Sequence, residues 1–277
     1  MTTAPPMGPA VAPPRLDGGK APRPTDTLRT EWTKLRSVRS TPVTLAVIAV
    51  MVVGLSGLIT FAVVTNHRHG ARVVSDPVGI LQSAWFLGLL AFMVLGVLVM
   101  TGEYSSGLIG PTLLATPKRL RVLSAKAAVF AVTALVTGEV VSFVNFFVSH
   151  AIASGYALFP DPAIGDHNVL RAVIGMGIDA ALAGLMGLGL GTLLRSTAWS
   201  ITTGVAITFV LPLIFSFLPS SWSNPLLEYW PTQAGSQLEE VNRQAHALTA
   251  WWGTGDLALF VFLLLAAAGY LLVKRDA

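Results

Sequence analysis

Six long apolar stretches, separated by shorter polar segments, dominate this sequence. An α-helix rises about 1.5 Å per residue, so about 20 apolar residues cross the roughly 30 Å hydrocarbon core of a membrane. The stretches approach that length and predict transmembrane helices over residues 42–65, 79–100, 122–149, 172–194, 201–218 and 257–273. We therefore expect an all-α polytopic membrane protein, because helices satisfy their own backbone hydrogen bonds inside lipid.

The composition agrees with this fold class. Only 12% of the 277 residues are charged, whereas a soluble domain carries about 25%. The chain has no cysteine, which excludes disulfide frameworks, thiolate metal sites and cysteine nucleophiles. The net charge of +4 is sorted between loops in the way that membrane topology requires, so nucleic acid is not an expected partner.

Three regions are predicted along the chain. Residues 1–24 hold seven of the 17 prolines and little apolar bulk, which indicates a disordered cytoplasmic tail. Residues 25–41 form an amphipathic helix, and residues 42–277 form the membrane domain. The second cytoplasmic segment of that domain covers residues 101–119, and its extracellular segment covers residues 219–256.

The amphipathic helix carries apolar side chains at helical spacing, namely Leu28, Trp32, Leu35 and Val38, while its Lys and Arg residues point elsewhere. Directly before a span, this pattern is typical of a helix on the membrane surface, with Trp32 at the depth of the lipid headgroups. The alternative is a solvated helix that contacts another part of the protein.

The distribution of basic residues predicts the orientation. Six spans place both termini on one side, and fourteen of the 18 Lys and Arg residues fall on that side. Cytoplasmic loops carry the excess of Lys and Arg, so both termini are expected in the cytoplasm. The expected location is the plasma membrane. The outer segment holds four tryptophans, whose rings suit the membrane interface: Trp222, Trp230, Trp251 and Trp252.

Two carboxylates fall inside predicted spans, Glu139 in the third and Asp179 in the fourth. Ionisable groups at that depth are costly, so each belongs either to a polar cavity or to a structural contact between helices. The many glycines of the fourth span predict close contact with neighbouring helices. Pro212 lies inside the fifth span and predicts a kink there.

The second cytoplasmic segment is the most distinctive. It carries Glu103 and Tyr104 near its start, continues through a short apolar run and ends in Pro-Lys-Arg, which indicates a short helix across the cytoplasmic face. From about residue 25 to the end, the chain resembles the ABC-2 type permease subunits of bacterial ABC exporters. The motifs that carry this resemblance are residues 101–119, EWTKLRS at 31–37, YWPTQAG at 229–235 and the terminal RDA.

The resemblance implies a homodimer, or a dimer with a similar permease, in which each half docks on a separate ATPase subunit that binds ATP. The helix before the first span resembles the connecting helix of the family, and residues 103–117 resemble its coupling helix. The residues implied to contact the ATPase are Glu103, Tyr104, Leu108, Ile109 and Leu113. Gly110 departs from the family pattern, in which a basic residue is common.

The leading hypothesis is a transporter subunit that is not itself an enzyme and has no cofactor, metal site or catalytic residue of its own. No GxxxxGK[ST] motif occurs, so ATP hydrolysis requires a partner. One alternative is a proton-coupled secondary transporter that uses Glu139 or Asp179 and works without an ATPase. The other is an intramembrane hydrolase with Ser56 as nucleophile, in the Gly-Leu-Ser-Gly of residues 54–57.

Overall fold

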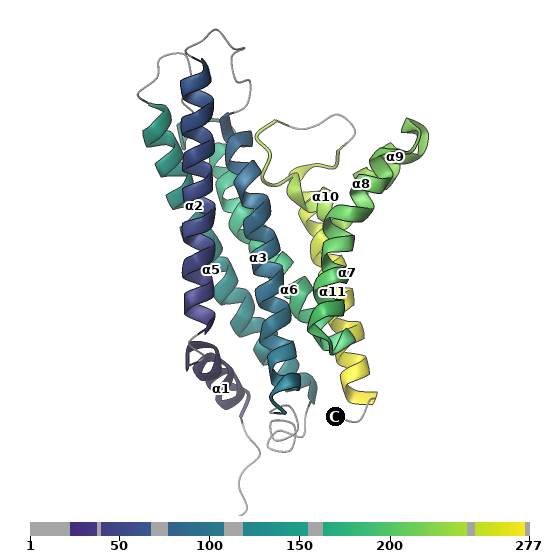
Figure 1. Ribbon diagram of the computed structural model, residues 1–277. Helices are drawn as coiled ribbons and strands as arrows, with labels where there is room; N and C mark the ends of the chain where they lie inside the picture. Colours follow the sequence, from purple (N-terminus) through teal and green to yellow (C-terminus); the bar gives the residue numbers. More distant parts are fainter. Residues whose placement is uncertain are drawn as a thin grey trace, which may run out of the picture.

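The computed structural model describes residues 23–37, 40–67, 77–107, 119–154, 163–242 and 247–274. Its regular elements are helices, and no strand occurs in these ranges (Figure 1). The long helices are α2 (Ser40–His67), α3 (Pro77–Ser105), α5 (Arg119–Ala153), α6 (Val169–Leu194) and α11 (Ala250–Lys274). The shorter elements are α1 (Pro24–Ser37), α7 (Thr197–Val205), the π-helix η1 (Ala206–Val210), α8 (Leu211–Ser216), α9 (Ser220–Glu228) and α10 (Pro231–Ser236).

Six helical segments are long and apolar enough to cross a membrane, so the prediction of an all-α polytopic membrane protein is confirmed. The fifth segment is continuous through α7, η1 and α8. Each segment overlaps one predicted span. The last one begins at Ala250, seven residues before the predicted start, and therefore includes Trp251 and Trp252.

The helix α6 lies at the centre of the bundle. It packs against α3, α5 and α11, and 72% of its most apolar window is buried, compared with 17% for the fifth span. A Cβ atom on Gly187 would lie within 3.0 Å of the Met93 carbonyl oxygen, and one on Gly96 within 3.0 Å of the Gly184 carbonyl oxygen. The backbones of α3 and α6 are therefore in direct contact, which confirms the close packing predicted for the glycine-rich span.

Pro212 interrupts the regular backbone hydrogen bonds of the fifth span. It has no backbone N–H. The π-helix Ala206–Val210 ends two positions before it, and there the Leu211 N–H bonds to the Ala206 carbonyl. The carbonyl of Ile207 therefore receives no backbone N–H from either residue 211 or residue 212. It accepts the indole N–H of Trp230 instead, at 2.8 Å.

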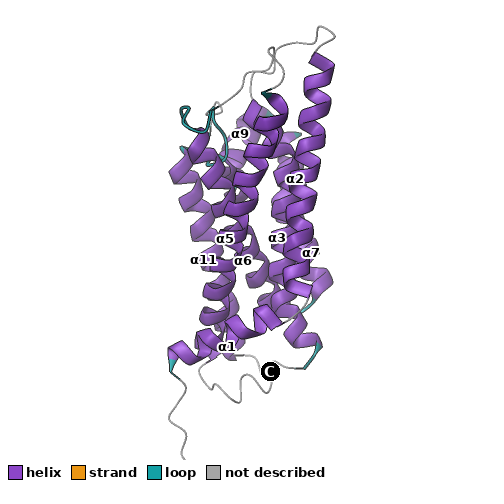
Figure 2. Ribbon diagram, turned by 90° about the vertical axis from the view of Figure 1, so that its left-hand side faces the viewer, coloured by secondary structure: helices purple, strands orange, loops and turns teal. Residues whose placement is uncertain are grey.

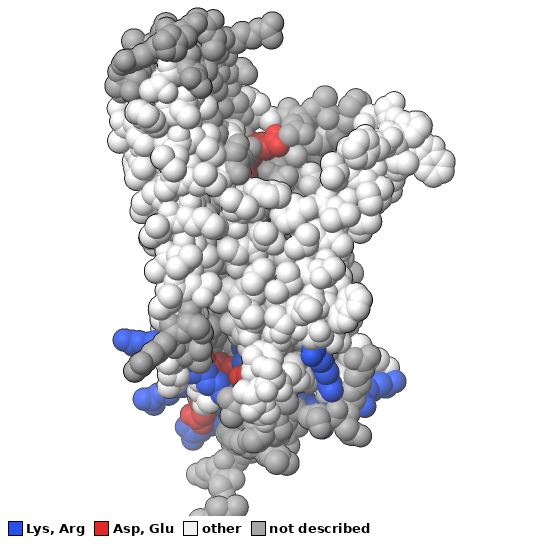
Figure 3. Space-filling view, viewed as in Figure 1, with Lys and Arg blue, Asp and Glu red and all other residues white. Residues whose placement is uncertain are grey.

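One end of the bundle is basic. Figure 2 shows α1 lying across that end, where α11 also finishes. Figure 3 shows the Lys and Arg side chains of the visible face gathered at the same end. Both ends of the described chain thus lie on one side of the spans. The predicted tail over residues 1–24 falls almost entirely outside the described residues.

Candidate functional site

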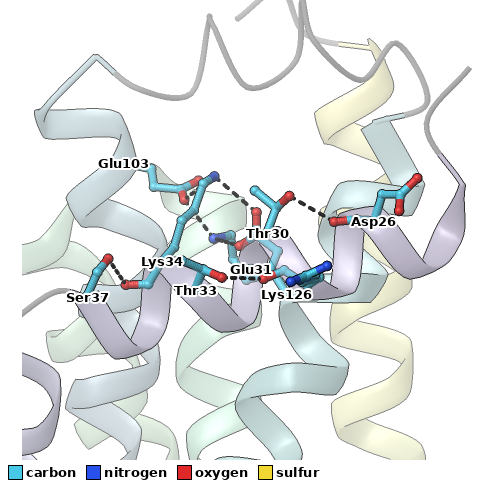
Figure 4. Close-up of polar contacts among 9 residues, drawn as sticks. Asp26, Thr30, Glu31, Thr33, Lys34, Ser37, Glu103 and Lys126 are labelled. Atoms are coloured by element: carbon cyan, nitrogen blue, oxygen red, sulfur yellow. Dashed lines mark hydrogen bonds and ion pairs between the residues drawn. The ribbon is translucent and has the colours of Figure 1, made fainter. Parts of the chain in front are cut away.

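Four charged side chains from three helices meet at the basic end (Figure 4). Glu31 and Lys34 lie on α1, Glu103 lies near the end of α3, and Lys126 lies in the first turns of α5. The Lys126 ammonium is 2.5 Å from a Glu31 carboxylate oxygen and 2.8 Å from one of Glu103. The Lys34 ammonium is 3.0 Å from Glu31 and 3.1 Å from Glu103. We refer to these four residues as the ion cluster.

Most of the ion cluster is shielded from water. The side chains of Glu31 and Lys126 are 4% and 5% exposed, while that of Lys34 is 33% exposed. Burial lowers the pKa of Lys34, but the hydrogen bond to Glu31 and the charge of Glu103 outweigh it and raise the pKa above 10.5. With two cations and two carboxylates the cluster is neutral, so it ties α1 to α3 and α5 without a net buried charge.

The ion cluster shows which face of α1 meets the protein. Thr27 and Glu31 are buried against the bundle, whereas Leu28 and Trp32 are exposed. The predicted alternative of a helix that contacts another part of the protein therefore holds for one face. The exposed apolar face is the one expected on the membrane surface, and that placement stays a prediction.

The residues expected to contact an ATPase fall into two groups. The Glu103 side chain is 12% exposed and belongs to the ion cluster. The Tyr104 ring carries the Arg195 guanidinium 5.3 Å from its centroid and packs against Met100 and Val122. A direct contact of these two side chains with an ATPase stays a prediction. Leu108, Ile109 and Leu113 lie outside the described residues.

A second polar group lies in the outer half of the bundle. Asp179 on α6 and Glu239, just after α10, are both buried, and their carboxyl groups are close enough to hydrogen-bond to each other. Both line a cavity of about 220 Å³ between α3, α6, η1, α10 and α11. We refer to this space as the outer cavity. Figure 3 shows acidic side chains in a recess at that end of the molecule.

Arg171 places Glu239 in the outer cavity. Its guanidinium donates to the carbonyl oxygens of Gln237 at 3.2 Å and Glu240 at 2.5 Å, on either side of Glu239. The Asn168 amide donates to the Val241 carbonyl at 3.2 Å from the N-cap position of α6, where its φ of 65° is in the left-handed region. Two polar side chains at the start of α6 thus fold the segment after α10 back onto the bundle.

Glu139 and Asp179 do not meet. The Glu139 side chain packs over Gly177 of α6, where a Cβ atom would overlap its carboxyl group. Gly177 and Asp179 are two residues apart, which turns them about 200° around the helix axis. Glu139 therefore lies on the other side of α6 from the outer cavity, and it does not line that cavity.

The five predicted interface tryptophans also divide. Four have exposed rings: Trp32 at 47%, Trp222 at 67%, Trp251 at 65% and Trp252 at 76%. Trp230 differs, because its indole N–H is bonded to Ile207 and its ring lies edge-on to Phe215, with centroids 5.0 Å apart. The ring is held by these contacts, and its place at the membrane interface stays a prediction.

Comparison with known proteins assigns this chain to no family. No family model matches the chain, and no curated protein matches it. Within the described ranges no group of three or more His, Asp or Glu side chains could hold a metal ion. The ion cluster and the outer cavity are therefore the two candidate functional features.

Sequence reasoning did not predict most of the charged residues of these features, namely Glu31, Lys34, Lys126 and Glu239. Glu31 and Lys126 are 95 residues apart, so spacing could not pair them. Glu239 was placed in a polar outer loop, whereas it is buried beside Asp179. A signal was present, since Arg171 at the outer end of an apolar helix needs acceptors that a nearby loop can supply.

We expect Glu239→Gln to remove one pH dependence of stability. Burial, followed by the charge of Asp179, raises the pKa of Glu239 well above 4.5. A carboxyl group that holds its proton more tightly when folded stabilises the fold most at low pH, and this contribution is lost as pH rises from about 4.3 through the folded pKa. Melting temperatures measured from pH 4 to pH 8 should therefore fall less steeply in the variant.

The matched control for this prediction is Glu228→Gln in α9, because Glu228 does not line the outer cavity. That variant should keep the pH slope of the unmodified protein. Equal slopes in the unmodified protein and the Glu239→Gln variant would mean that Glu239 does not bind its proton more tightly in the folded state.

Proposed function

We propose that this chain is the membrane-spanning permease subunit of an ATP-driven exporter of the ABC-2 type, coupled to a separate ATPase. The supporting observation is the ion cluster, which joins α1 to the end of α3 and the start of α5. The helices α3 and α5 flank the segment that holds most of the predicted coupling helix, residues 103–117. A force applied to that segment would therefore act on α1, α3 and α5 together.

The mechanism follows from this connection. ATP binding closes the two ATPase subunits and displaces the docked segment of each permease. The ion cluster keeps α1 aligned with α3 and α5, because separating its partners would leave charges buried without counter-ions. The direct backbone contact between α3 and α6 then carries the displacement to the centre of the bundle, so that access alternates between the two sides.

The proposal includes a dimer, with a second copy or with a similar permease. The fifth span supports this part, because only 17% of its most apolar window is buried within one chain. It leaves large apolar side chains such as Leu213, Ile214 and Phe217 uncovered. A second permease would cover this face at the centre of a translocation path.

The orientation places the basic end in the cytoplasm and α9 outside the cell. The absence of native cysteine makes this testable with Thr33→Cys on α1 and Ser221→Cys on α9, which are both exposed positions. In intact cells a membrane-impermeant maleimide should label the α9 variant, and it should label the α1 variant only after lysis. Labelling of the α1 variant in intact cells would reverse the orientation.

The coupling test uses Leu108→Ala combined with Leu113→Ala. Losing an apolar anchor of an interface commonly costs more than about 1 kcal/mol, so the pair should reduce ATPase retention at least tenfold. The measurement is the amount of ABC ATPase that co-purifies with the tagged full chain, together with ATP hydrolysis by the complex. The control is Leu58→Ala on α2, whose side chain is 68% exposed and far along the chain from this segment.

Unchanged ATPase retention in the double variant, with normal ATP hydrolysis, would refute the coupling assignment. Absence of any ABC ATPase from the unmodified complex would refute the proposed function. The second candidate would then take its place. It is a proton-coupled secondary transporter, which the buried Asp179 and Glu239 pair favours, and it would transport in proteoliposomes under a proton gradient without an ATPase.

The hydrolase alternative has no such support. Ser56 is fully buried, and its hydroxyl has no hydrogen-bond partner among the residues that the structure describes. A serine nucleophile needs a general base within hydrogen-bond reach, so this position does not favour covalent catalysis. Ser56 is not proposed as a catalytic residue.

A further inference from the structure

We propose that the outer cavity binds a small organic cation, an aryl- or alkylammonium group, with Asp179 and Glu239 as its counter-ions. The binding of such a cation is a property of this chain alone. The further claim that organic cations are the exported substrate class rests on the proposed function.

The charges around the outer cavity are the first argument. Asp179, Glu239 and Glu240 line it, and none of the described residues that line it is Lys or Arg. Asp179 and Glu239 are 6% and 4% exposed, and one Glu239 carboxylate oxygen is buried without a hydrogen-bond partner among the described residues. The Trp85 indole is the neighbouring N–H group that favours the ionised Glu239. The hydrogen bonds of Arg171 described above go to backbone carbonyls, and Arg171 does not line the cavity. A positively charged ligand would supply a counter-charge to Asp179 and Glu239.

The apolar wall is the second argument, and it distinguishes an organic cation from a metal ion. Phe86 and Phe209 line the cavity with ring centroids 4.1 Å apart, and Met93 and Leu257 lie on the same wall. Aromatic faces attract cations, and the apolar side chains accommodate the carbon skeleton of an organic one. A hydrated metal ion would find two or three carboxylates but few of the other oxygen ligands that it needs.

The hydroxyl groups of Thr208 and Thr232 provide the third argument. Both line the cavity, and both oxygens are buried without a hydrogen-bond partner among the described residues. Their dipoles can turn their oxygens toward a cation at no cost in existing hydrogen bonds. The cavity therefore combines acidic side chains, aromatic faces and hydroxyl groups without hydrogen-bond partners among the described residues. Its volume of about 220 Å³ suits a ligand of roughly ten heavy atoms.

Ligand binding also favours ionisation of the carboxyl pair. Burial and the charge of Asp179 raise the pKa of Glu239, because two neighbouring carboxylates resist ionising together. A bound cation stabilises the ionised form of both. The same two residues thus give the cavity its preference for a positive charge.

The test is direct binding to the full-length chain in lipid nanodiscs, without ATPase or ATP. The probe is benzyltrimethylammonium, whose charge does not change with pH. The matched ligand is neopentylbenzene, in which a neutral carbon replaces the nitrogen. Titration followed by saturation-transfer NMR should show at least tenfold tighter binding of the cation, because shape and apolar area are nearly the same in the two ligands.

Variants then locate the site. Asp179→Asn combined with Glu239→Gln should weaken binding of the cation at least tenfold and leave the weak binding of neopentylbenzene unchanged. Glu139→Gln is the matched control, because it neutralises a carboxylate inside a span that does not line the cavity. Ala183→Leu fills the cavity and keeps both carboxylates, so it should weaken binding of both ligands. It also decides the matter if the double variant fails to fold.

Equal affinities of the unmodified chain for the two ligands would overturn the proposal. So would undiminished cation binding by a folded double variant or by Ala183→Leu. Since neither ATPase nor ATP is present, these outcomes do not bear on coupling. Conversely, a chain that retains no ATPase but binds the cation selectively would refute the proposed export function and leave the cation site intact.

Discussion

Lys126→Met should lower the free energy of unfolding by about 3–5 kcal/mol, the usual cost of removing one partner from a buried ion pair. The Lys126 ammonium lies between Glu31 and Glu103, at 2.5 Å and 2.8 Å, and its side chain is 5% exposed. Methionine preserves most of the chain length and removes the charge. Two carboxylates would then share the single, more exposed Lys34. Unfolding in mixed detergent micelles measures the effect.

The control for this prediction is the double variant with Lys126→Met and Glu31→Gln. It keeps the Lys34 and Glu103 pair, which lies at 3.1 Å, and leaves no uncompensated carboxylate. Its loss should therefore be smaller than that of Lys126→Met alone, which is the opposite of additive behaviour. If the double variant instead loses as much stability as Lys126→Met and Glu31→Gln lose separately, added together, the ion cluster does not act as a unit. The proposal that it transmits force to α3 and α5 would then be refuted.

The spans could be predicted because each is specified locally. A run of about 20 apolar residues has a single stable solution in lipid, whichever helices surround it. The glycines of α6 and the position of Pro212 were equally informative, since close approach and a missing N–H depend on the residue itself. The ends of α5 and α11 extend beyond the predicted limits because polar residues continue a helix outside the hydrocarbon at little cost.

The candidate sites could be predicted only in part, because they are made of long-range pairs. Asp179 stood out by its depth in the membrane, but its partner Glu239 follows 60 residues later in a segment that is polar by composition. The helical pattern of α1 identified the exposed apolar side chains Leu28 and Trp32, whereas Leu35 packs partly against the core. It could not reveal that Glu31, beside that apolar face, would meet a lysine of α5. Such pairs need the tertiary fold, which a single sequence does not display.

The packing of α3 against α6 links the outer cavity to the rest of the bundle. Met93 of α3 lines the cavity, and its carbonyl group lies against Gly187 of α6. At the other end of α3, Glu103 belongs to the ion cluster. A displacement of α3 along α6 would therefore change both features, provided that the two backbones stay in contact.

Gly187→Ala should disrupt this contact and lower the free energy of unfolding by about 3 kcal/mol, at the upper end of the range for overpacking a core. A Cβ atom there would lie within 3.0 Å of the Met93 carbonyl oxygen and would also crowd the Met93 Cα. These are backbone atoms, so no side chain can move aside, and α3 and α6 must separate. Unfolding in mixed micelles measures the loss.

Gly54→Ala on α2 is the matched control, since nothing lies within 4 Å of its new Cβ atom. This change should raise stability by up to about 1 kcal/mol, because alanine favours a helix over glycine. The opposite signs expected for the same substitution separate backbone contact from helix propensity. If both variants gained stability, α3 and α6 would not be held in backbone contact at Gly187, and displacement could not pass between them there.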